Sequence, residues 1–217
     1  MQVQRVQNNI YFQAKIPKTI PPIYKTSQSK SNTIVVLGSS KTTNDILKYM
    51  DMCSSSVKNM VLNGKNIVTG CCSLGIMGSA YYAAKENSKE NVEGKPIQNL
   101  AIITNPLWGD EDLEHCIPIA CAKSEADRIE KFSEVADTMV LFAGGAGTMQ
   151  EATTLISKNY YGKKEDKKKV ILVGKDFFKG LIEQYNKLYE TGLIKCPPSE
   201  LFTVVDNEDE LAQIIER

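Results

Sequence analysis

The sequence predicts an α/β protein in which a parallel sheet is covered by helices on both faces. Short apolar segments typical of strands alternate with longer segments whose apolar residues recur at helical spacing. The strand segments are continuously apolar, as expected for parallel strands that are buried on both faces. Two of them run directly into glycine-rich loops, and ligands bind beyond the carboxyl ends of the strands in such doubly wound sheets. We therefore expect both loops at one edge of the sheet.

The chain of 217 residues is long enough for one large domain. Residues 1–30 are polar and contain Pro17, Pro21 and Pro22, so we expect an extended arm there and a single domain at 31–217. Acidic and basic residues balance at 26 each, which gives no bulk charge for binding nucleic acid or a membrane surface. No apolar run approaches the ~20 residues of a membrane-spanning helix, and the N-terminus lacks the apolar region of a signal peptide.

The cysteines give a further indication of the compartment. There are six, and none forms a C-x-x-C pair, which argues against a zinc site or a thioredoxin-type site. Buried reduced thiols in a cytoplasmic protein are the expectation. No metal and no cofactor is expected from the residue pattern.

The first half of the domain begins with an apolar run at 34–37, which predicts a strand that ends at Gly38. From residue 46 to residue 61 apolar side chains recur every three or four positions, and Gly64 is expected to end that helix. The same reasoning predicts, in order, a strand at 67–69, a glycine loop at 70–78, a helix through 80–84, a strand at 100–104, an acidic loop at 105–115, a strand at 117–120 and a helix at 123–135.

The second half opens with an apolar strand at 138–142, followed by a glycine loop and a helix whose apolar positions run from 149 to 156. A helix at 178–189 carries a clear i, i+3, i+4, i+7 apolar stripe. The remaining expected segments are a lysine-rich loop at 163–169, a strand at 170–173, a strand at 201–205 and a helix at 207–215.

The glycine loop of the second half gives the strongest chemical signal. Gly144, Gly145 and Gly147 lie between the strand and the helix, and Thr148 follows. Backbone N–H groups at a helix N-terminus attract phosphate, and glycines let a ligand approach the backbone closely. Because helical side chains lean toward the N-terminus, the carboxylate of Glu151 can reach the mouth of this site. The pattern suits an anionic ligand whose reacting centre lies close to its phosphate.

Purely structural alternatives exist for the acidic and basic residues near this loop. Thr148 and Glu151 fit the S/T-x-x-E capping box, in which the glutamate only fixes the helix start. A cap alone does not require three glycines, which favours the binding interpretation. Arg128 lies on the helix expected beside the central strand, and an ion pair with Glu125 at i−3 would explain it without any function.

Several familiar motifs are incomplete. Gly70 and Gly75 have the first half of a phosphate-loop spacing, but Ile76-Met77 replace its lysine and hydroxyl residue. The loop at Gly145 lacks the third glycine of a dinucleotide-binding fingerprint, which makes a nicotinamide-dependent oxidoreductase a distant alternative. His115 is the single histidine, so neither a Ser-His-Asp triad nor a histidine metal site has enough parts.

Four stretches together resemble the LOG family, the cytokinin-activating nucleoside 5′-monophosphate phosphoribohydrolases that were long labelled lysine decarboxylases. The resemblance covers residues 33–217. Residues 144–151 resemble the family's G-G-x-G-T-x-x-E signature, and Gly75-Ile-Met-Gly78 resembles its G-L-M-G. Asp127-Arg128 is similar to the Glu-Arg of its E-R-K-x-x-M helix, and residues 176–195 are similar to its C-terminal part.

The resemblance implies a Rossmann-like homodimer that hydrolyses the N-glycosidic bond of AMP or an N6-modified AMP, giving free base and ribose 5-phosphate. It implies that Glu151 and Arg128 are catalytic. It assigns phosphate or substrate binding to Gly144, Gly145, Gly147, Thr148, Gly75 and Gly78. Aromatic pairs in excess of one core's needs also favour a dimer interface; they are Tyr81, Tyr82, Tyr160 and Tyr161.

The sequence also departs from the family pattern. Ala143 replaces the usual proline before the glycines, Ile129 replaces the lysine of E-R-K, and Cys71-Cys72 stand where glycines are common. These changes affect substrate choice more than the fold. They also leave a second hypothesis open, namely a non-enzymatic carrier that binds a nucleotide or cofactor on the same fold.

Overall fold

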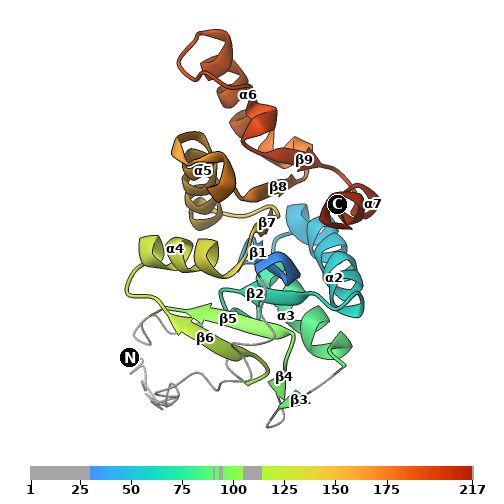
Figure 1. The fold of residues 1–217 in the computed structure, drawn as a ribbon. Coiled ribbons are helices and arrows are strands. Elements are labelled where there is room, and N and C mark those ends of the chain that lie inside the picture. The colour runs from blue at the N-terminus through green and yellow to red at the C-terminus, as the bar shows by residue number, and fades with distance from the viewer. Residues whose placement is uncertain (1–29, 90, 93–94, 105–113, 217) are drawn as a thin grey trace, which may run out of the picture.

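The computed structural model describes residues 30–89, 91–92, 95–104 and 114–216. The expected N-terminal arm and most of the expected acidic loop lie outside the described residues. Within them a seven-stranded sheet is formed by β1 (Thr33–Leu37), β2 (Asn66–Thr69), β5 (Asn99–Ile103), β6 (Ile117–Cys121), β7 (Thr138–Leu141), β8 (Lys169–Val173) and β9 (Thr203–Val205). The strand order is β6-β5-β2-β1-β7-β8-β9, and every pairing is parallel, which confirms the predicted sheet (Figure 1).

Six α-helices in the described part of the chain cover this sheet. They are α2 (Leu47–Leu62), α3 (Gly75–Asn87), α4 (Glu125–Val135), α5 (Ala146–Tyr161), α6 (Lys175–Glu190) and α7 (Glu208–Glu216). Helices α2, α3 and α7 pack on one face, and α4, α5 and α6 pack on the other (Figure 1). None of them is long and apolar enough to cross a membrane.

Strand β1 shows why the strand sequences are continuously apolar. Ile34 and Val36 belong to the core beneath α2 and α3, whereas Val35 and Leu37 belong to the core beneath α4 and α5. Successive side chains of a strand point to opposite faces, so a sheet covered on both faces needs an apolar residue at every position. The two cores therefore confirm the predicted doubly wound architecture.

The chain changes direction across the sheet at β1. It proceeds from β1 to β2, β5 and β6 on one side, and then returns to place β7 on the other side of β1. The register pairs Leu37 with Leu141, so the two strands end together. Ligands in open parallel sheets bind at such a switch point, outside the carboxyl ends of the strands. The expected glycine loop after β7 begins at this point.

Some local boundaries differ from the prediction. Helix α3 begins at Gly75, so Gly78 lies in its first turn rather than in the preceding loop. A small antiparallel hairpin of β3 (Asn91–Val92) and β4 (Lys95–Pro96) was not anticipated. Four short 3-10 helices also occur in the described residues, namely η1 (Lys30–Asn32), η2 (Asn44–Ile46), η4 (Lys164–Asp166) and η5 (Pro198–Glu200).

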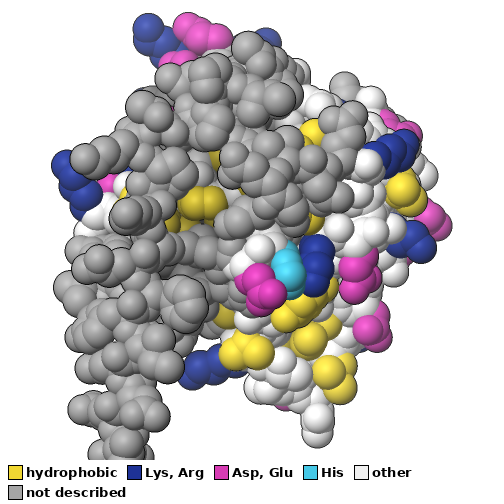
Figure 2. Space-filling model, turned by 90° about the horizontal axis from the view of Figure 1, so that it is seen from below, with side chains coloured by type: hydrophobic (Ala, Val, Ile, Leu, Met, Phe, Trp, Pro, Cys, Tyr) yellow, Lys and Arg dark blue, Asp and Glu magenta, His cyan; other side chains and the backbone are white. Residues whose placement is uncertain are grey.

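The proposed role of the tyrosine pairs in an interface is wrong for one member. Tyr81 is fully buried, and its hydroxyl accepts a hydrogen bond from the backbone N–H of His115 at 2.9 Å. Its neighbour Tyr82 is exposed and packs edge-on against it, with ring centroids 5.2 Å apart. Figure 2 shows this side of the molecule, where hydrophobic and charged side chains surround the histidine. Tyr81 is therefore a core residue, while Tyr82 remains on the surface.

Candidate functional site

Three loops converge at the switch point, and they follow β1, β2 and β7. The backbone N–H of Ser39 donates to the carbonyl of Ala143 at 3.0 Å, which joins the first loop to the third. The N–H of Met77 donates to the carbonyl of Ser39 at 3.2 Å, which joins the start of α3 to the first loop. Gly75 has a φ of +61°, and a Cβ there would lie 2.5 Å from the Ser39 carbonyl oxygen. The loops therefore pack backbone against backbone.

The loop after β1 was missed as part of the site by sequence reasoning, which treated it only as a turn. Ser39 fixes the loop locally, since its hydroxyl donates to the Lys41 carbonyl at 2.9 Å and accepts from the Lys41 N–H at 3.0 Å. Gly38 approaches the side chain of Ile76 so closely that a Cβ at Gly38 would lie 3.1 Å from the isoleucine Cβ. The signal that could have identified this loop is its place after the first strand of the sheet.

The three glycines before α5 divide into two kinds. A Cβ at Gly144 would overlap the side chain of Thr148, which is buried, so this glycine is needed for packing. A Cβ at Gly145 or at Gly147 would meet no atom within 4 Å. The structure thus gives no internal packing reason for the last two glycines. Open space beside them is what a ligand at the start of α5 requires.

The start of α5 excludes the capping-box alternative. Helix α5 begins at Ala146, and Gly145 is its N-cap, with no side-chain capping bond and no acidic residue in the first turn. Thr148 therefore lies inside the helix, whereas a capping box would place it at the N-cap with Glu151 in the first turn. Glu151 lies one turn further along the helix. It does not cap the helix start, and that interpretation is wrong.

Glu151 lies in an environment that disfavours its charge. Burial of the carboxyl group raises the pKa of Glu151 to about 8, with Arg128 acting to lower it and Glu125 acting to raise it further. The Glu151 residue as a whole is partly exposed. A carboxylic acid with a pKa near neutrality can exchange a proton during a reaction. Such shifted groups are common at functional sites.

Arg128 is held by a local structure that the sequence encodes. The Ser124 hydroxyl caps α4 by accepting from the Asp127 N–H at 3.2 Å. From α4, Arg128 Nη2 donates to the Gly70 carbonyl at 3.0 Å, and Nη1 lies 3.4 Å from Glu125 Oε1. The Arg128 side chain is only 13% exposed. The predicted ion pair exists, but the arginine is an interior residue and not a member of a surface pair.

Gly70 is the residue that makes this arrangement possible. A Cβ at Gly70 would overlap the Arg128 guanidinium, so only glycine leaves room for it. The Nε of Arg128 is buried and has no hydrogen-bond partner within the described structure. An unsatisfied buried donor on a cation is costly, and a bound anion or carbonyl would satisfy it. Sequence reasoning gave Gly70 no role, because its contact comes from a residue 58 positions away.

The structure brings Glu151 and Arg128 to one place, as their mutual electrostatic effect requires. Gly144, Gly145 and Thr148 lie at the start of the helix that carries Glu151. The two glycines expected to shape the first loop are packing residues. Gly75 lies against the loop after β1, and a Cβ at Gly78 would overlap the carbonyl of Ser73. Their direct contact with a ligand stays a prediction.

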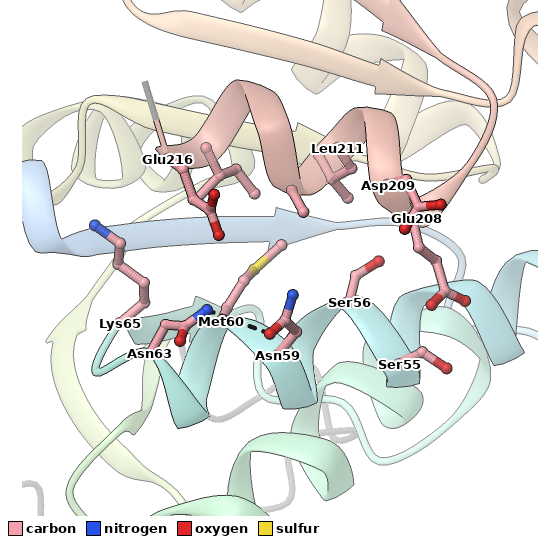
Figure 3. Close-up of a pocket in the computed structure, with 12 residues that line it drawn as sticks. Ser55, Ser56, Asn59, Met60, Asn63, Lys65, Glu208, Asp209, Leu211 and Glu216 are labelled. Atoms are coloured by element: carbon pink, nitrogen blue, oxygen red, sulfur yellow. Dashed lines mark hydrogen bonds between the residues drawn. The ribbon is translucent and has the colours of Figure 1, made fainter.

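Two cavities in the described structure lie away from this site. One of about 110 Å³ lies between α2 and α7 and includes Ser56, Asn59 and Leu211 (Figure 3). The other, of about 190 Å³, lies near Tyr49, Gly174 and Asp206. Among the described residues no group of three or more His, Cys, Asp or Glu side chains is arranged to hold a metal ion. The switch-point loops therefore remain the place where the chemically active groups gather.

Comparison with known proteins agrees with this fold. A model of the family described as "possible lysine decarboxylase" matches residues 60–215. The molybdenum cofactor binding protein of the phototrophic bacterium Rippkaea orientalis is 20% identical, with 85% of this chain and 93% of that chain covered and a TM-score of 0.53. The Moco carrier protein of Chlamydomonas reinhardtii is also 20% identical, with coverage of 85% and 94% and a TM-score of 0.54. No curated protein sequence matches the chain.

Proposed function

Because the chain belongs to the LOG-like family described as possible lysine decarboxylase, we propose that it hydrolyses the N-glycosidic bond of a nucleoside 5′-monophosphate. AMP or an N6-modified AMP of the cytokinin type is the proposed substrate, and the products are free base and ribose 5-phosphate. The observation that supports the proposal is the electrostatic proximity of Arg128 to Glu151, on a helix whose start has no side-chain cap. The proposal needs neither a metal nor a cofactor.

The phosphate of the substrate binds at the N-terminus of α5 in this proposal. The backbone N–H groups around Gly145 and Gly147 supply donors, and no side chain caps them. No acidic residue lies in the first turn to repel a dianion. Glu151 follows one turn later, so a phosphate at the helix start brings the ribose toward its carboxyl group.

Glycosidic cleavage develops positive charge on the ribose ring and negative charge on the departing base. We assign stabilisation of the positive charge on the ribose to Glu151, whose carboxylate lies near C1′ in this proposal. Glu151 also acts as the base that accepts a proton from the attacking water. Arg128 is assigned to the base, the ribose or the phosphate, through the Nε donor that has no partner in the described structure. The family description names a decarboxylase, but His115 is followed by Cys116 and not by the lysine of a pyridoxal site.

A carrier function is the second candidate, and a specific observation favours it. Two structures with this fold are described as a molybdenum cofactor binding protein and a Moco carrier protein. A carrier would use the same helix start and the same arginine to hold a phosphorylated ligand without cleaving it. The changes at Ile129 and at Cys71-Cys72 fit either function.

One experiment separates the two. The reduced full-length protein is incubated with a panel of nucleoside 5′-monophosphates and the matching nucleosides, and free base and ribose 5-phosphate are quantified by chromatography. We expect release from at least one monophosphate and far less from its nucleoside, because the donors at α5 stay unpaired without phosphate. Binding without any release would favour the carrier. Equal turnover of AMP and adenosine would mean that the glycine turn binds something else.

The proposal also includes a homodimer in the reducing cytoplasm. Six free cysteines support this proposal, because a reducing compartment keeps thiols unpaired. The surface that would form the dimer includes exposed aromatic and aliphatic side chains on α5 and after α6, namely Tyr161 and Leu193.

A further inference from the structure

Two buried thiols lie in contact next to the candidate site. Cys71 follows Gly70 in the loop after β2, and Cys116 directly precedes β6. Their sulfur atoms are 2.9 Å apart, although the residues are 45 positions apart in the chain, and both side chains are fully buried. This separation is only about 0.9 Å longer than the S–S bond of a disulfide.

Cys71 is an unfavourable residue for its backbone conformation. Its φ is +63°, and it is the only residue other than glycine with a positive φ in the described part of the chain. The left-handed conformation is unfavourable for an L-residue, whereas glycine adopts it freely. Backbone geometry therefore favours glycine at this position, and a thiol here calls for a chemical explanation.

The strained thiol is coupled to Arg128 through one peptide unit. The carbonyl of Gly70, which is bonded directly to the nitrogen of Cys71, accepts the hydrogen bond from Arg128 Nη2 at 3.0 Å. The guanidinium also fills the space of a side chain at Gly70. Gly70 and Arg128 are closely packed. A backbone rotation at Cys71 therefore moves the Gly70 carbonyl oxygen that accepts the hydrogen bond from Arg128.

The partner thiol is held from the other side. The N–H of His115 donates to the hydroxyl of Tyr81, which fixes the backbone that leads into Cys116. The neighbouring cysteines also make weak hydrogen bonds to the backbone, since Cys121 Sγ donates to the Thr104 carbonyl at 3.7 Å and Cys72 Sγ donates to the Leu74 carbonyl at 3.9 Å. The short distance between the Cys71 and Cys116 sulfur atoms identifies these two thiols as the reacting pair.

We propose that Cys71 and Cys116 are a redox modification site, in which a hydroperoxide converts the two thiols into a disulfide that displaces the Gly70 carbonyl from Arg128. One thiolate attacks the peroxide oxygen, giving a sulfenic acid and one water or alcohol molecule. The second thiol then attacks the sulfenic sulfur, forming the S–S bond and releasing water. The thiols lose two hydrogens and two electrons, and the peroxide is reduced.

A hydroperoxide suits this site because the smallest of them, hydrogen peroxide, needs only a local opening to reach buried sulfur. A dithiol reductant of the thioredoxin class returns the pair to thiols by exchange. The consequence for activity rests on the function proposed above. The formation of the disulfide and its effect on Arg128 are independent of that function.

The first test maps the bond. Reduced full-length protein is treated with hydrogen peroxide, and peptide mass spectrometry is expected to find a Cys71–Cys116 link, lighter by two hydrogen atoms and reversed by dithiothreitol. The link should be lost in Cys116→Ser and kept in the matched control Cys196→Ser, whose cysteine lies outside the cluster. Peroxide doses that oxidise Cys196 while leaving Cys71 and Cys116 unlinked would overturn the proposal.

The second test measures the environment of the Arg128 side chain by nuclear magnetic resonance. The chain has three arginines, Arg5, Arg128 and Arg217, so a protein labelled with ¹⁵N-arginine gives few Nε–H signals, and Arg128→Lys assigns one of them. We expect the Arg128 signal to shift on oxidation in the unmodified sequence and to stay fixed in Cys116→Ser and Cys116→Ala. A disulfide that leaves this signal unchanged would disprove the coupling.

The third readout is turnover of the best nucleoside monophosphate from the panel. Oxidation is expected to lower it about tenfold or more, the loss typical of removing a hydrogen bond to a charged group, and Cys116→Ser should be unaffected by peroxide. If no substrate is hydrolysed, the proposed function fails while the mapping and the arginine signal still decide the redox site. Full turnover in protein shown to carry the disulfide would refute regulation through this bond.

Discussion

Arg128 owes its chemical character to three neighbours that the fold places around it. Gly70 supplies a carbonyl acceptor and an empty Cβ position, and Glu125 balances part of the charge. The aromatic ring of Phe132 lies 5.7 Å from the guanidinium carbon. Only a planar guanidinium can donate to the Gly70 carbonyl while keeping a further donor in a fixed direction. Arg128 is therefore not interchangeable with lysine at this position.

Replacing Glu151 with glutamine tests the catalytic assignment. Glu151→Gln keeps the size and one acceptor of the side chain but can neither become negative nor take up a proton. We expect base release to fall about a hundredfold or more. Nucleotide affinity should be retained near pH 7, where the Glu151 carboxyl group is itself mostly protonated, and should increase above about pH 8, where a carboxylate would repel the phosphate. Rates of base release and calorimetric affinity are the measurements.

Glu190→Gln, at the exposed end of α6, is the matched control for loss of a carboxylate and should leave turnover unchanged. A Glu151→Gln protein with normal base release would remove Glu151 from the mechanism. Helix capping could not then explain the residue, because Gly145 is the N-cap.

The same residue predicts a pH dependence of stability. Burial raises the pKa of Glu151 from 4.5 to about 8, so between these values the folded state holds a proton that the unfolded state has released. The contribution of Glu151 to the free energy of unfolding is therefore fully present below about pH 4.5 and is lost as the pH rises toward 8. Glu151→Gln has no such group.

We therefore expect the free energy of unfolding of Glu151→Gln to increase relative to that of the unmodified protein as the pH rises, by about 1–3 kcal/mol between pH 5 and pH 9. Urea denaturation at several pH values measures the difference. A stability difference that does not change with pH would show that the carboxyl group titrates normally.

Helix α5 meets two requirements in different parts of its length, namely an open N-terminus and a side that packs in the core. Gly144, just before the helix, is a glycine because its Cβ position is filled by Thr148, whereas the Cβ positions of the N-cap Gly145 and of Gly147 in the first turn are open. The later turns of the helix bury Ala152, Leu155 and Ile156 in the core beneath α4 and α6. Core packing therefore anchors the helix, while the N-terminus is left free of side chains. This division suits a helix that presents its backbone to an anion.

Replacing Gly147 with alanine tests this division. A Cβ there meets nothing within 4 Å, and alanine is the better helix former, so we expect Gly147→Ala to raise stability by about 0.5–1 kcal/mol. We also expect weaker binding of nucleotide, because the Cβ occupies the space beside the phosphate. Thermal denaturation and calorimetry with AMP measure the two effects.

Gly180→Ala is the control, because Gly180 lies within α6 and its Cβ position is equally open. It should give a similar gain in stability with unchanged affinity. Equal affinity in both variants would place the ligand away from the start of α5.

At the scale of the molecule, one helix among the described elements projects from the sheet. Helix α6 and the residues after it extend away from the sheet (Figure 1), and only Phe178 of the helix is buried. Leu193 is 71% exposed just beyond the helix, and Tyr161 at the end of α5 is 84% exposed. Apolar side chains of this size are more typical of an interface than of a solvated surface. The shape thus supports the proposed homodimer.

We expect the protein to be a dimer at micromolar concentration, as measured by light scattering coupled to gel filtration. Leu193→Lys should shift the distribution toward the monomer, because it places a charge within an apolar contact. Lys179→Ala, also on α6 but in an exposed ion pair with Glu183, is the control and should leave the dimer intact. A monomer in the unmodified protein would refute the dimer.

Much of the fold followed from local patterns. The strand at 34–37 and the helix at 46–61 were predicted within one or two residues, because burial on both faces leaves a continuous apolar run and a helix leaves a period of 3.6. A helix after the glycine turn was predicted for the same reason, since a strand, a glycine turn and an apolar stripe are all local features, although the helix begins at Ala146, before the expected apolar positions. The β3–β4 hairpin was missed because two-residue strands carry no period.

Neighbouring residues in the chain were enough to predict the alternation of strands and helices, the parallel sheet and the glycine loop before the helix that carries Glu151, since each depends on a local pattern. The tertiary structure was needed to establish that Gly145 is the N-cap of α5, which removes the capping-box alternative for Thr148, and that Tyr81 belongs to the core. It was also needed to place Arg128 in the space at Gly70. Such contacts join residues tens of positions apart, and no local periodicity records which distant side chain occupies the space left by a glycine.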